Sequence, residues 1–177
     1  MSGPPRFLKA GSVRGLILAA VLAAAVGIFL VATFTWAPAA PHVTFTSIQG
    51  EKIAIASLRG KVVLVNFWAT DCVICIKEMP DMARSYERYR DRGLEFIAVA
   101  MRHDPPNRVL DYTERNRLPF KVALDPVGEL AVAFGSVTFT PTTFVIDRRG
   151  KIVARIQGAP DFAKLQKLLE EKLAEPA

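Results

Sequence analysis

The chain has 177 residues, of which 51% are hydrophobic, so it can form one globular domain with an appendage. The net charge of +6 includes Arg6, Lys9 and Arg14, which all precede the first acidic residue, Glu51. Beyond that point charges of both signs are interspersed, with no basic stripe interleaved with aromatic residues. We therefore expect no nucleic-acid partner.

Residues 15–36 predict a transmembrane signal anchor. No charge occurs from Gly15 to Phe34, and a helix of that length spans about 30 Å, the hydrocarbon thickness of a bilayer. Basic residues precede this segment and none follows until Lys52, which keeps residues 1–14 in the cytoplasm by the positive-inside rule. We expect a single-pass protein of the bacterial inner membrane, with its domain in the periplasm or at the cell exterior.

Two other interpretations of this segment remain open. A cleaved signal peptide would use Ala37-Pro38-Ala39 as a small-x-small site, but the apolar core is long and Pro38 suits such a site poorly. A buried helix of the globular domain is disfavoured because no face of the segment is polar.

The Ala- and Pro-rich residues 37–42 predict a linker, and residues 43–177 predict the globular domain. The domain is expected to begin with a β-hairpin. Apolar and polar residues alternate from His42 to Ile48, and a Gln-Gly-Glu turn separates them from a second strand at Lys52–Ile55.

Strands and helices alternate through the rest of the domain. Apolar runs predict buried strands at 62–68 and 94–101, which we expect to be parallel because a helix at about 72–90, with Pro80 as a kink, lies between them. Asp104 is expected to cap the next helix. The remaining elements are that helix to about 116, a strand at 120–124, a helix at 125–134, a hairpin of 142–147 with 151–157, and a helix at 160–174. This order predicts an α/β fold with a mixed central β-sheet flanked by helices.

The only two cysteines, Cys72 and Cys75, lie where the central strand turns into a helix. At a helix N-terminus, unpaired N–H groups and the macrodipole favour a thiolate. Disulfides that staple an exported protein occur in larger sets at scattered spacings, and a loop this short constrains the unfolded chain little. The pair therefore predicts redox chemistry.

The stretch Phe67-Trp68-Ala69-Thr70-x-Cys72-x-x-Cys75-x-x-Glu78-Met79-Pro80, with Gly-Lys-Val-Val-Leu-Val-Asn before it and Pro-Thr-Thr-Phe-Val-Ile-Asp at 141–147, carries a family resemblance. It resembles the TlpA/ResA-type (CcmG/DsbE-like) proteins of the AhpC/TSA superfamily. These are membrane-anchored, extracytoplasmic thiol–disulfide oxidoreductases that include reductants of cytochrome c maturation. The resemblance covers about residues 43–174. It implies a thioredoxin-like fold with an N-terminal β-hairpin and a central insert at 101–120.

The resemblance also implies roles for single residues. Cys72 would attack the substrate disulfide, and Cys75 would resolve the mixed disulfide. Pro141 matches the cis-proline that packs opposite the pair, and Thr140 would offer its backbone to an extended substrate. Trp68 matches a tryptophan near the disulfide, with a plain core role as the alternative.

Three positions depart from the family pattern. Asp71 replaces the usual tryptophan, Val73-Ile74 replaces a proline-containing pair, and Asn66 stands where thioredoxin has a buried acid. Because Asn66 cannot take the proton of Cys75, Glu78 is the candidate base. It lies three residues after Cys75 and shares its helix face. The alternative is a solvated surface glutamate.

The departures bear on the direction of electron flow. An aliphatic dipeptide desolvates the Cys72 thiolate and Asp71 adds a negative charge beside it, so both raise the thiol pKa against the helix dipole. A less stable thiolate lowers the reduction potential, so we expect an electron donor. A Cys72 pKa near the value of about 3.5 found in DsbA would contradict this.

The leading hypothesis is a tethered reductase of disulfides in client proteins such as apocytochrome c or a copper-site protein. Electrons would come from an inner-membrane dithiol carrier, because neither G-x-G-x-x-G nor a Walker loop occurs and no cofactor is expected. No metal is expected either, since His42 and His103 lack ligand-type spacing to the cysteines.

The alternatives are a disulfide oxidase or isomerase, a copper chaperone and a thiol peroxidase. A chaperone would bind copper through the two thiolates, but the sequence lacks a nearby Met or His cluster. A peroxidase needs a proline where Val65 stands.

Overall fold

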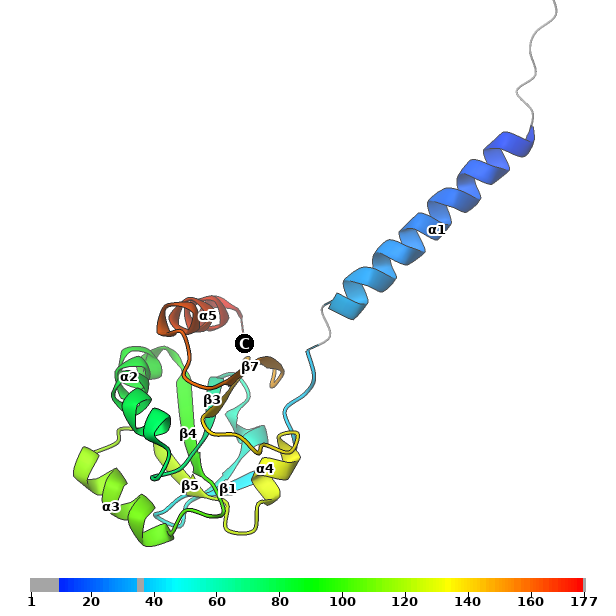
Figure 1. The fold of residues 1–177 in the computed structure, drawn as a ribbon. Helices are drawn as coiled ribbons and strands as arrows, with labels where there is room; N and C mark the ends of the chain where they lie inside the picture. The colour runs from blue at the N-terminus through cyan, green and yellow to red at the C-terminus, as the bar shows by residue number, and fades with distance from the viewer. Residues whose placement is uncertain (1–9, 35–36, 177) are drawn as a thin grey trace, which may run out of the picture. The chain divides into compact units, whose positions relative to one another are not determined.

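The computed structural model describes residues 10–34 and 37–176 and divides into two compact units between Ala37 and Pro38. In the first unit, helix α1 spans Ala10–Phe34 (Figure 1). Within the described residues, no helix is long and apolar enough to cross a membrane. Residues 1–9 of the predicted cytoplasmic segment, and residues 35–36 of the predicted anchor, lie outside the described residues.

The second unit is built around a five-stranded sheet with the order β5-β4-β3-β6-β7. Strand β3 lies at its centre, parallel to β4 and antiparallel to β6, and every residue of β3 and β4 is buried. The predicted mixed sheet is confirmed. The strands are β3 (Val62–Trp68), β4 (Leu94–Ala100), β5 (Lys121–Leu124), β6 (Thr142–Ile146) and β7 (Ile152–Gln157).

Alternate residues of β3 face two hydrophobic clusters, one on each side of the sheet. Leu64 and Trp68 pack with residues of α2 and α5, whereas Val65 and Phe67 pack with the N-terminal hairpin and α4 (Figure 1). Asn66 alternates with Leu64 and Trp68 along β3, so its side chain points to the same side of the sheet, toward α2. The helices are α2 (Val73–Tyr89), α3 (Pro106–Asn116), α4 (Glu129–Ala133) and α5 (Phe162–Ala174), with short 3-10 helices η1 (Ile55–Leu58) and η2 (Arg90–Arg92).

The predicted N-terminal hairpin is confirmed as a separate two-stranded sheet of β1 (Thr44–Thr46) and β2 (Lys52–Ala54). The compact unit, however, starts earlier than residue 43. Ile152 N donates to Pro38 O at 2.8 Å, and Ala40 N donates to Gly150 O at 2.9 Å. Residues 38–40 of the predicted linker are therefore bonded to the start of β7 and to the turn before it, as an extension of the folded unit.

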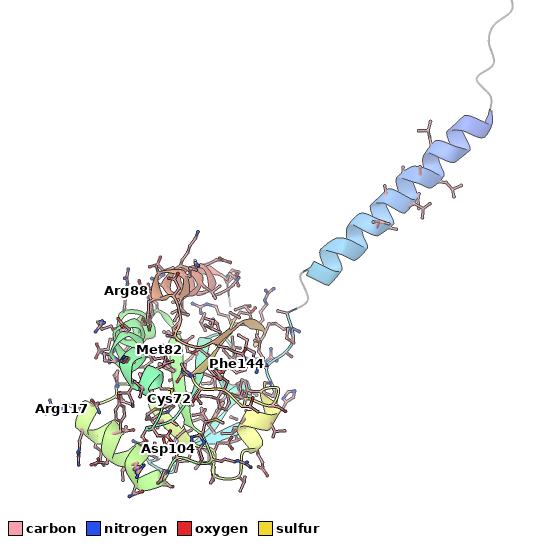
Figure 2. The ribbon with its side chains drawn as sticks, in the orientation of Figure 1. Cys72, Met82, Arg88, Asp104, Arg117 and Phe144 are labelled. Carbon is pink, nitrogen blue, oxygen red and sulfur yellow. A yellow bond between two sulfur atoms is a disulfide. The ribbon has the colours of Figure 1, made fainter. Side chains whose placement is uncertain are left out.

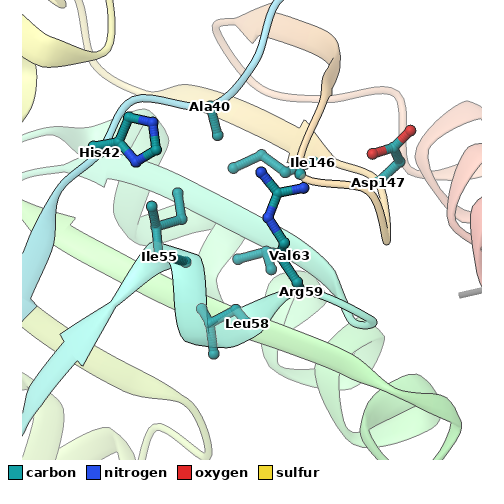
Figure 3. Close-up of a pocket in the computed structure, with 10 residues that line it drawn as sticks. Ala40, His42, Ile55, Leu58, Arg59, Val63, Ile146 and Asp147 are labelled. Carbon is teal, nitrogen blue, oxygen red and sulfur yellow. The ribbon is translucent and has the colours of Figure 1, made fainter.

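A small cavity is lined by Ala40 and His42 of the N-terminal segment and by Arg59 and Ile146 (Figure 3). Its volume is about 20 Å³, and η1 supplies part of its wall. A cavity of this size holds about one water molecule.

The predicted cap of α3 is wrong. This helix begins at Pro106 with Pro105 at the N-cap, and no side chain caps it. Proline at the first helical positions suits the start because it has no N–H to satisfy. The carboxylate of Asp104 is instead bonded to Thr70, in the loop before α2.

The helix expected at residues 125–134 is shorter than predicted. Residues 125–128 form a turn in which Gly128 N donates to Asp125 O, and α4 then begins at Glu129. The Asp125 carboxylate accepts from the backbone N–H groups of Leu130 and Ala131. Asp125 therefore satisfies the N-terminal donors of α4 from outside the helix.

Candidate active site

The two cysteines form a disulfide at the start of α2. Cys72 is the N-cap residue, and its Sγ accepts a hydrogen bond from Cys75 N at 3.2 Å. Cys72 is half-buried and labelled in Figure 2, whereas Cys75 is fully buried. This arrangement confirms the predicted placement of the first sulfur at a helix N-terminus. An accessible Cys72 and an enclosed Cys75 suit an attacking and a resolving sulfur respectively.

Glu78 is buried on the inner face of α2, with 3% of its surface exposed. Asn66 Nδ2 on β3 donates to Glu78 Oε1 at 3.1 Å and to Thr143 Oγ1 on β6 at 2.9 Å. The alternative of a solvated surface glutamate is therefore wrong. Glu78 Oε2 has no hydrogen-bond partner among the described residues.

Burial raises the pKa of Glu78 from 4.5 to about 7, and the hydrogen bond from Asn66 opposes that shift only in part. A carboxyl group with such a pKa is about half ionised at neutral pH, so it can both take and return a proton. Cys75 lies one helical turn before Glu78, on the same buried face. The arrangement places a carboxyl group with a raised pKa on the buried helix face that carries Cys75.

The peptide bond between Thr140 and Pro141 is cis, as the family resemblance implies. Thr142 pairs with Phe67 across β6 and β3, so Pro141 lies at the end of the sheet from which the chain leaves toward Cys72. Pro141 is buried and Thr140 is partly exposed. The structure thus brings the proline loop and the disulfide to one edge of the domain.

Trp68 contributes to the core beneath this site. Its side chain has no exposed surface, and its ring lies against Tyr112 of α3 with 5.3 Å between centroids. It also belongs to the same hydrophobic cluster as Cys75. A residue without accessible surface cannot touch a docked polypeptide, so Trp68 has the core role in this oxidised structure.

The two residues between the cysteines and one residue of the proline loop expose apolar side chains. Val73 and Ile74, between the two cysteines, are 66% and 46% exposed. Phe139, in the loop that leads to Pro141, is 54% exposed. Sequence reasoning missed Phe139, whose only signal is an aromatic residue within the Ser-Val-Thr-Phe-Thr loop.

A cavity of about 420 Å³ opens at the same end of the domain, and Thr140 forms part of its wall. Met101, Val132 and Val137 give it an apolar lining, and His103 stands at its border. Within the described part of the chain, no group of three His, Cys, Asp or Glu side chains could hold a metal ion.

Comparison with known proteins places this geometry in context. The model of the AhpC/TSA family matches residues 37–155. The chain is 35% identical over 132 residues to thiol-disulfide oxidoreductase ResA of Bacillus thuringiensis subsp. konkukian, covering 75% of each protein. It is 34% identical over 131 residues to ResA of Geobacillus thermodenitrificans, covering 74% of each.

Solved structures agree with the fold. A thiol:disulfide interchange protein of the thioredoxin family from Chlorobium tepidum superposes with a TM-score of 0.72 at 30% identity, covering 79% of this chain and 99% of that one. A putative thioredoxin from Neisseria meningitidis gives 0.70 at 33% identity, covering 77% and 88%. A putative DsbE from Chlorobium tepidum gives 0.72 at 27%, covering 78% and 97%. The predicted thioredoxin-like fold is confirmed.

Proposed function

The chain belongs to the AhpC/TSA family and is a thiol–disulfide oxidoreductase, and we propose that it reduces disulfides in client proteins through Cys72 and Cys75. The observation that carries the proposal is the buried Glu78, with its pKa raised to about 7, on the helix face of Cys75. A proton acceptor of this kind serves the resolving thiol, and resolution is the step that completes reduction of a client.

The reaction follows from this arrangement. The Cys72 thiolate attacks one sulfur of the client disulfide, and the other client sulfur leaves as a thiolate that takes up a proton. The Cys75 thiol gives its proton to Glu78, and Cys75 then attacks Cys72. The remaining client sulfur leaves as a thiolate and takes the proton that Glu78 had accepted, which returns Glu78 to its ionised form. Two electrons and two protons have passed to the client, and the Cys72–Cys75 disulfide has formed.

The surface around the disulfide supports a protein client. Val73, Ile74 and Phe139 expose apolar side chains, and the cavity beside Thr140 could take a client side chain. We propose that an extended client segment binds along Thr140 and Pro141, as in the family that the sequence resembles. We further propose apocytochrome c or a copper-site protein as the client.

The oxidised protein needs electrons from another dithiol, and we propose an inner-membrane dithiol carrier as the donor. The proposed anchor is residues 15–36, on the evidence of the uncharged run and the flanking charges of the sequence. The domain would then stand in the periplasm or at the cell exterior. Protease accessibility in intact and permeabilised spheroplasts tests this orientation, and digestion of the domain only after permeabilisation would contradict it.

A trapping experiment tests the function. In a Cys75→Ser variant, Cys72 attacks a client but cannot be released, so a mixed disulfide with an apocytochrome c peptide should accumulate. A Cys72→Ser variant is the matched control and should form none. Equal trapping by both variants would contradict the assigned roles. Stoichiometric copper binding or peroxide turnover by the unaltered protein would instead favour the chaperone or the peroxidase.

A further inference from the structure

The loop after β4 is bonded to the segment that precedes Cys72. Met101 N donates to Trp68 O at 3.0 Å. Thr70 N donates to Asp104 Oδ2 at 2.6 Å, and Thr70 Oγ1 donates to Asp104 Oδ1 at 2.6 Å. Two consecutive parts of one loop thus hold the chain between the end of β3 and the attacking cysteine.

Asp104 forms the strongest of these connections. The residue is 5% exposed, and both of its carboxylate oxygens accept a short hydrogen bond. It has no ion-pair partner among the described residues. A carboxylate that accepts hydrogen bonds at both oxygens has its acceptor capacity well used.

Thr70 belongs to the turn that presents the sulfur. Cys72 N donates to Ala69 O at 3.2 Å, so Thr70 and Asp71 are the central residues of that turn. Asp104 fixes Thr70 at both its backbone N–H and its hydroxyl. The turn is therefore held from outside at the position two residues before Cys72.

We propose that Asp104 is a positioning residue for Cys72: it holds the preceding turn through Thr70 and adds a buried negative charge to that turn. The inference rests on the proposed function only in taking Cys72 as the attacking sulfur. The charge disfavours the Cys72 thiolate and so deepens the reducing character of the pair.

Other charged groups surround Cys72, and they differ from Asp104 in exposure. Asp71 Oδ1 lies 3.6 Å from His103 Nε2, with both side chains more than half exposed, so salt and water screen that pair. Lys77 on α2 is exposed, and Glu78 is buried and bonded to Asn66. Asp104 combines burial with a fixed connection to the turn of Cys72.

The Asp104→Asn variant tests the effect of the negative charge while it keeps the hydrogen bonds that hold Thr70. Its amide can still accept from Thr70 N and can donate to Thr70 Oγ1, but it carries no charge. Asp147→Asn is the matched control. Asp147 is also buried and accepts backbone N–H groups, from Arg149 and Lys151, but it follows Ile146, which pairs with Val63 at the opposite end of β3.

The test measures the rate of Cys72 alkylation by iodoacetamide against pH, in the full chain held in detergent and in a Cys75→Ser background. We expect Asp104→Asn to raise the acidity constant of Cys72 about tenfold and Asp147→Asn to leave it within twofold. An Asp104→Asn value within twofold of the parent, or an equal change in both variants, would overturn the proposal.

Thr70→Val keeps the charge and removes one donor to Asp104. At a pH above the Cys72 pKa the sulfur is fully ionised in both proteins. We expect the Thr70→Val variant to exchange with a peptide disulfide several-fold more slowly than the parent. An unchanged rate would refute the positioning role of Asp104. If the Asp104→Asn variant does not fold, the Thr70→Val measurement alone decides whether Asp104 positions Cys72. Failure of the unaltered protein to reduce any client disulfide would count against the proposed function instead, since the alkylation comparison does not depend on a client.

Discussion

Asn66 and Glu78 are joined by a buried hydrogen bond of 3.1 Å from Nδ2 to Oε1, between the central strand and the helix of the disulfide. Asn66 stands where thioredoxin carries an acid, according to the resemblance of the sequence. In this protein the helix carries the buried acid, and the strand supplies a neutral donor to it. A single buried carboxyl group beside Cys75 avoids the repulsion of two like charges.

Glu78→Gln should slow turnover of a client disulfide about ten- to hundredfold at pH 7, because the variant has no group to accept the Cys75 proton. The unaltered protein should show a rise in rate as Glu78 ionises around pH 7, and the variant should lack that rise. Glu87→Gln, at an exposed position of α2, is the matched control. An identical pH–rate profile in the Glu78→Gln protein would exclude Glu78 as the base.

The same residue should make stability depend on pH. The pKa of Glu78 is raised from 4.5 in the unfolded chain to about 7 in the folded protein, so the folded state binds the proton more tightly. Its contribution is then fully present below about pH 4.5 and is lost as pH rises through about 7. The loss amounts to roughly 3 kcal/mol above pH 7.

Glu78→Gln removes this loss, since its side chain stays neutral. We expect the variant to be more stable than the unaltered protein at pH 8 by about 2 to 3 kcal/mol, with a smaller difference at pH 5. Urea unfolding at both pH values measures it. A variant that is less stable at pH 8 would show that Glu78 is not held in an unfavourable charged state.

Phe139→Ala should separate client binding from stability. An exposed side chain contributes little to folding, so the free energy of unfolding should change by less than about 0.5 kcal/mol. Reduction of a protein disulfide should slow several-fold, whereas reduction of a small aromatic disulfide should stay unchanged. Equal effects on both substrates would mean that Phe139 does not contact clients.

Trp68→Ala, by contrast, should lower the free energy of unfolding strongly. Trp68 is fully buried against Tyr112, and removal of such a side chain costs about 3 to 5 kcal/mol. Thermal or urea unfolding would register that loss. A change below about 1 kcal/mol would contradict the core role assigned to Trp68.

Removal of the N-terminal segment should weaken the domain. A chain that begins at residue 43 lacks the hydrogen bonds of Pro38 to Ile152 and of Ala40 to Gly150. We expect it to lose about 1 to 3 kcal/mol relative to a chain that begins at Pro38. Urea unfolding compares the two. Equal stability would mean that residues 38–40 do not contribute to the folded unit.

Much of the fold follows from local pattern. The continuous apolar runs at β3 and β4 and the helix between them predict a parallel pair, because such runs are buried on both faces. The cysteine pair at the strand–helix junction predicts where the redox site lies. These features depend on residues that are neighbours in the chain.

The sequence-based predictions that were wrong concern residues whose partners are distant in sequence. Asp104 has the residue type and position of a helix cap, but Thr70 offers its carboxylate two donors that no local pattern reveals. Residues 38–40 have the composition of a linker, yet the start of β7 and the turn before it bind their backbone. Burial of Glu78 depends on Asn66 and on the sheet beneath α2, so the sequence could name the residue but not its pKa.

The midpoint potential of the Cys72–Cys75 couple tests the central claim most directly. The domain from Pro38 onward would be equilibrated with dithiol and disulfide buffers, and its oxidised fraction measured. The potential of thioredoxin is about −270 mV and that of DsbA is about −120 mV. If the protein is a reductase, its midpoint potential should be at or below about −250 mV. A potential above about −170 mV would mean that the protein forms or shuffles disulfides instead.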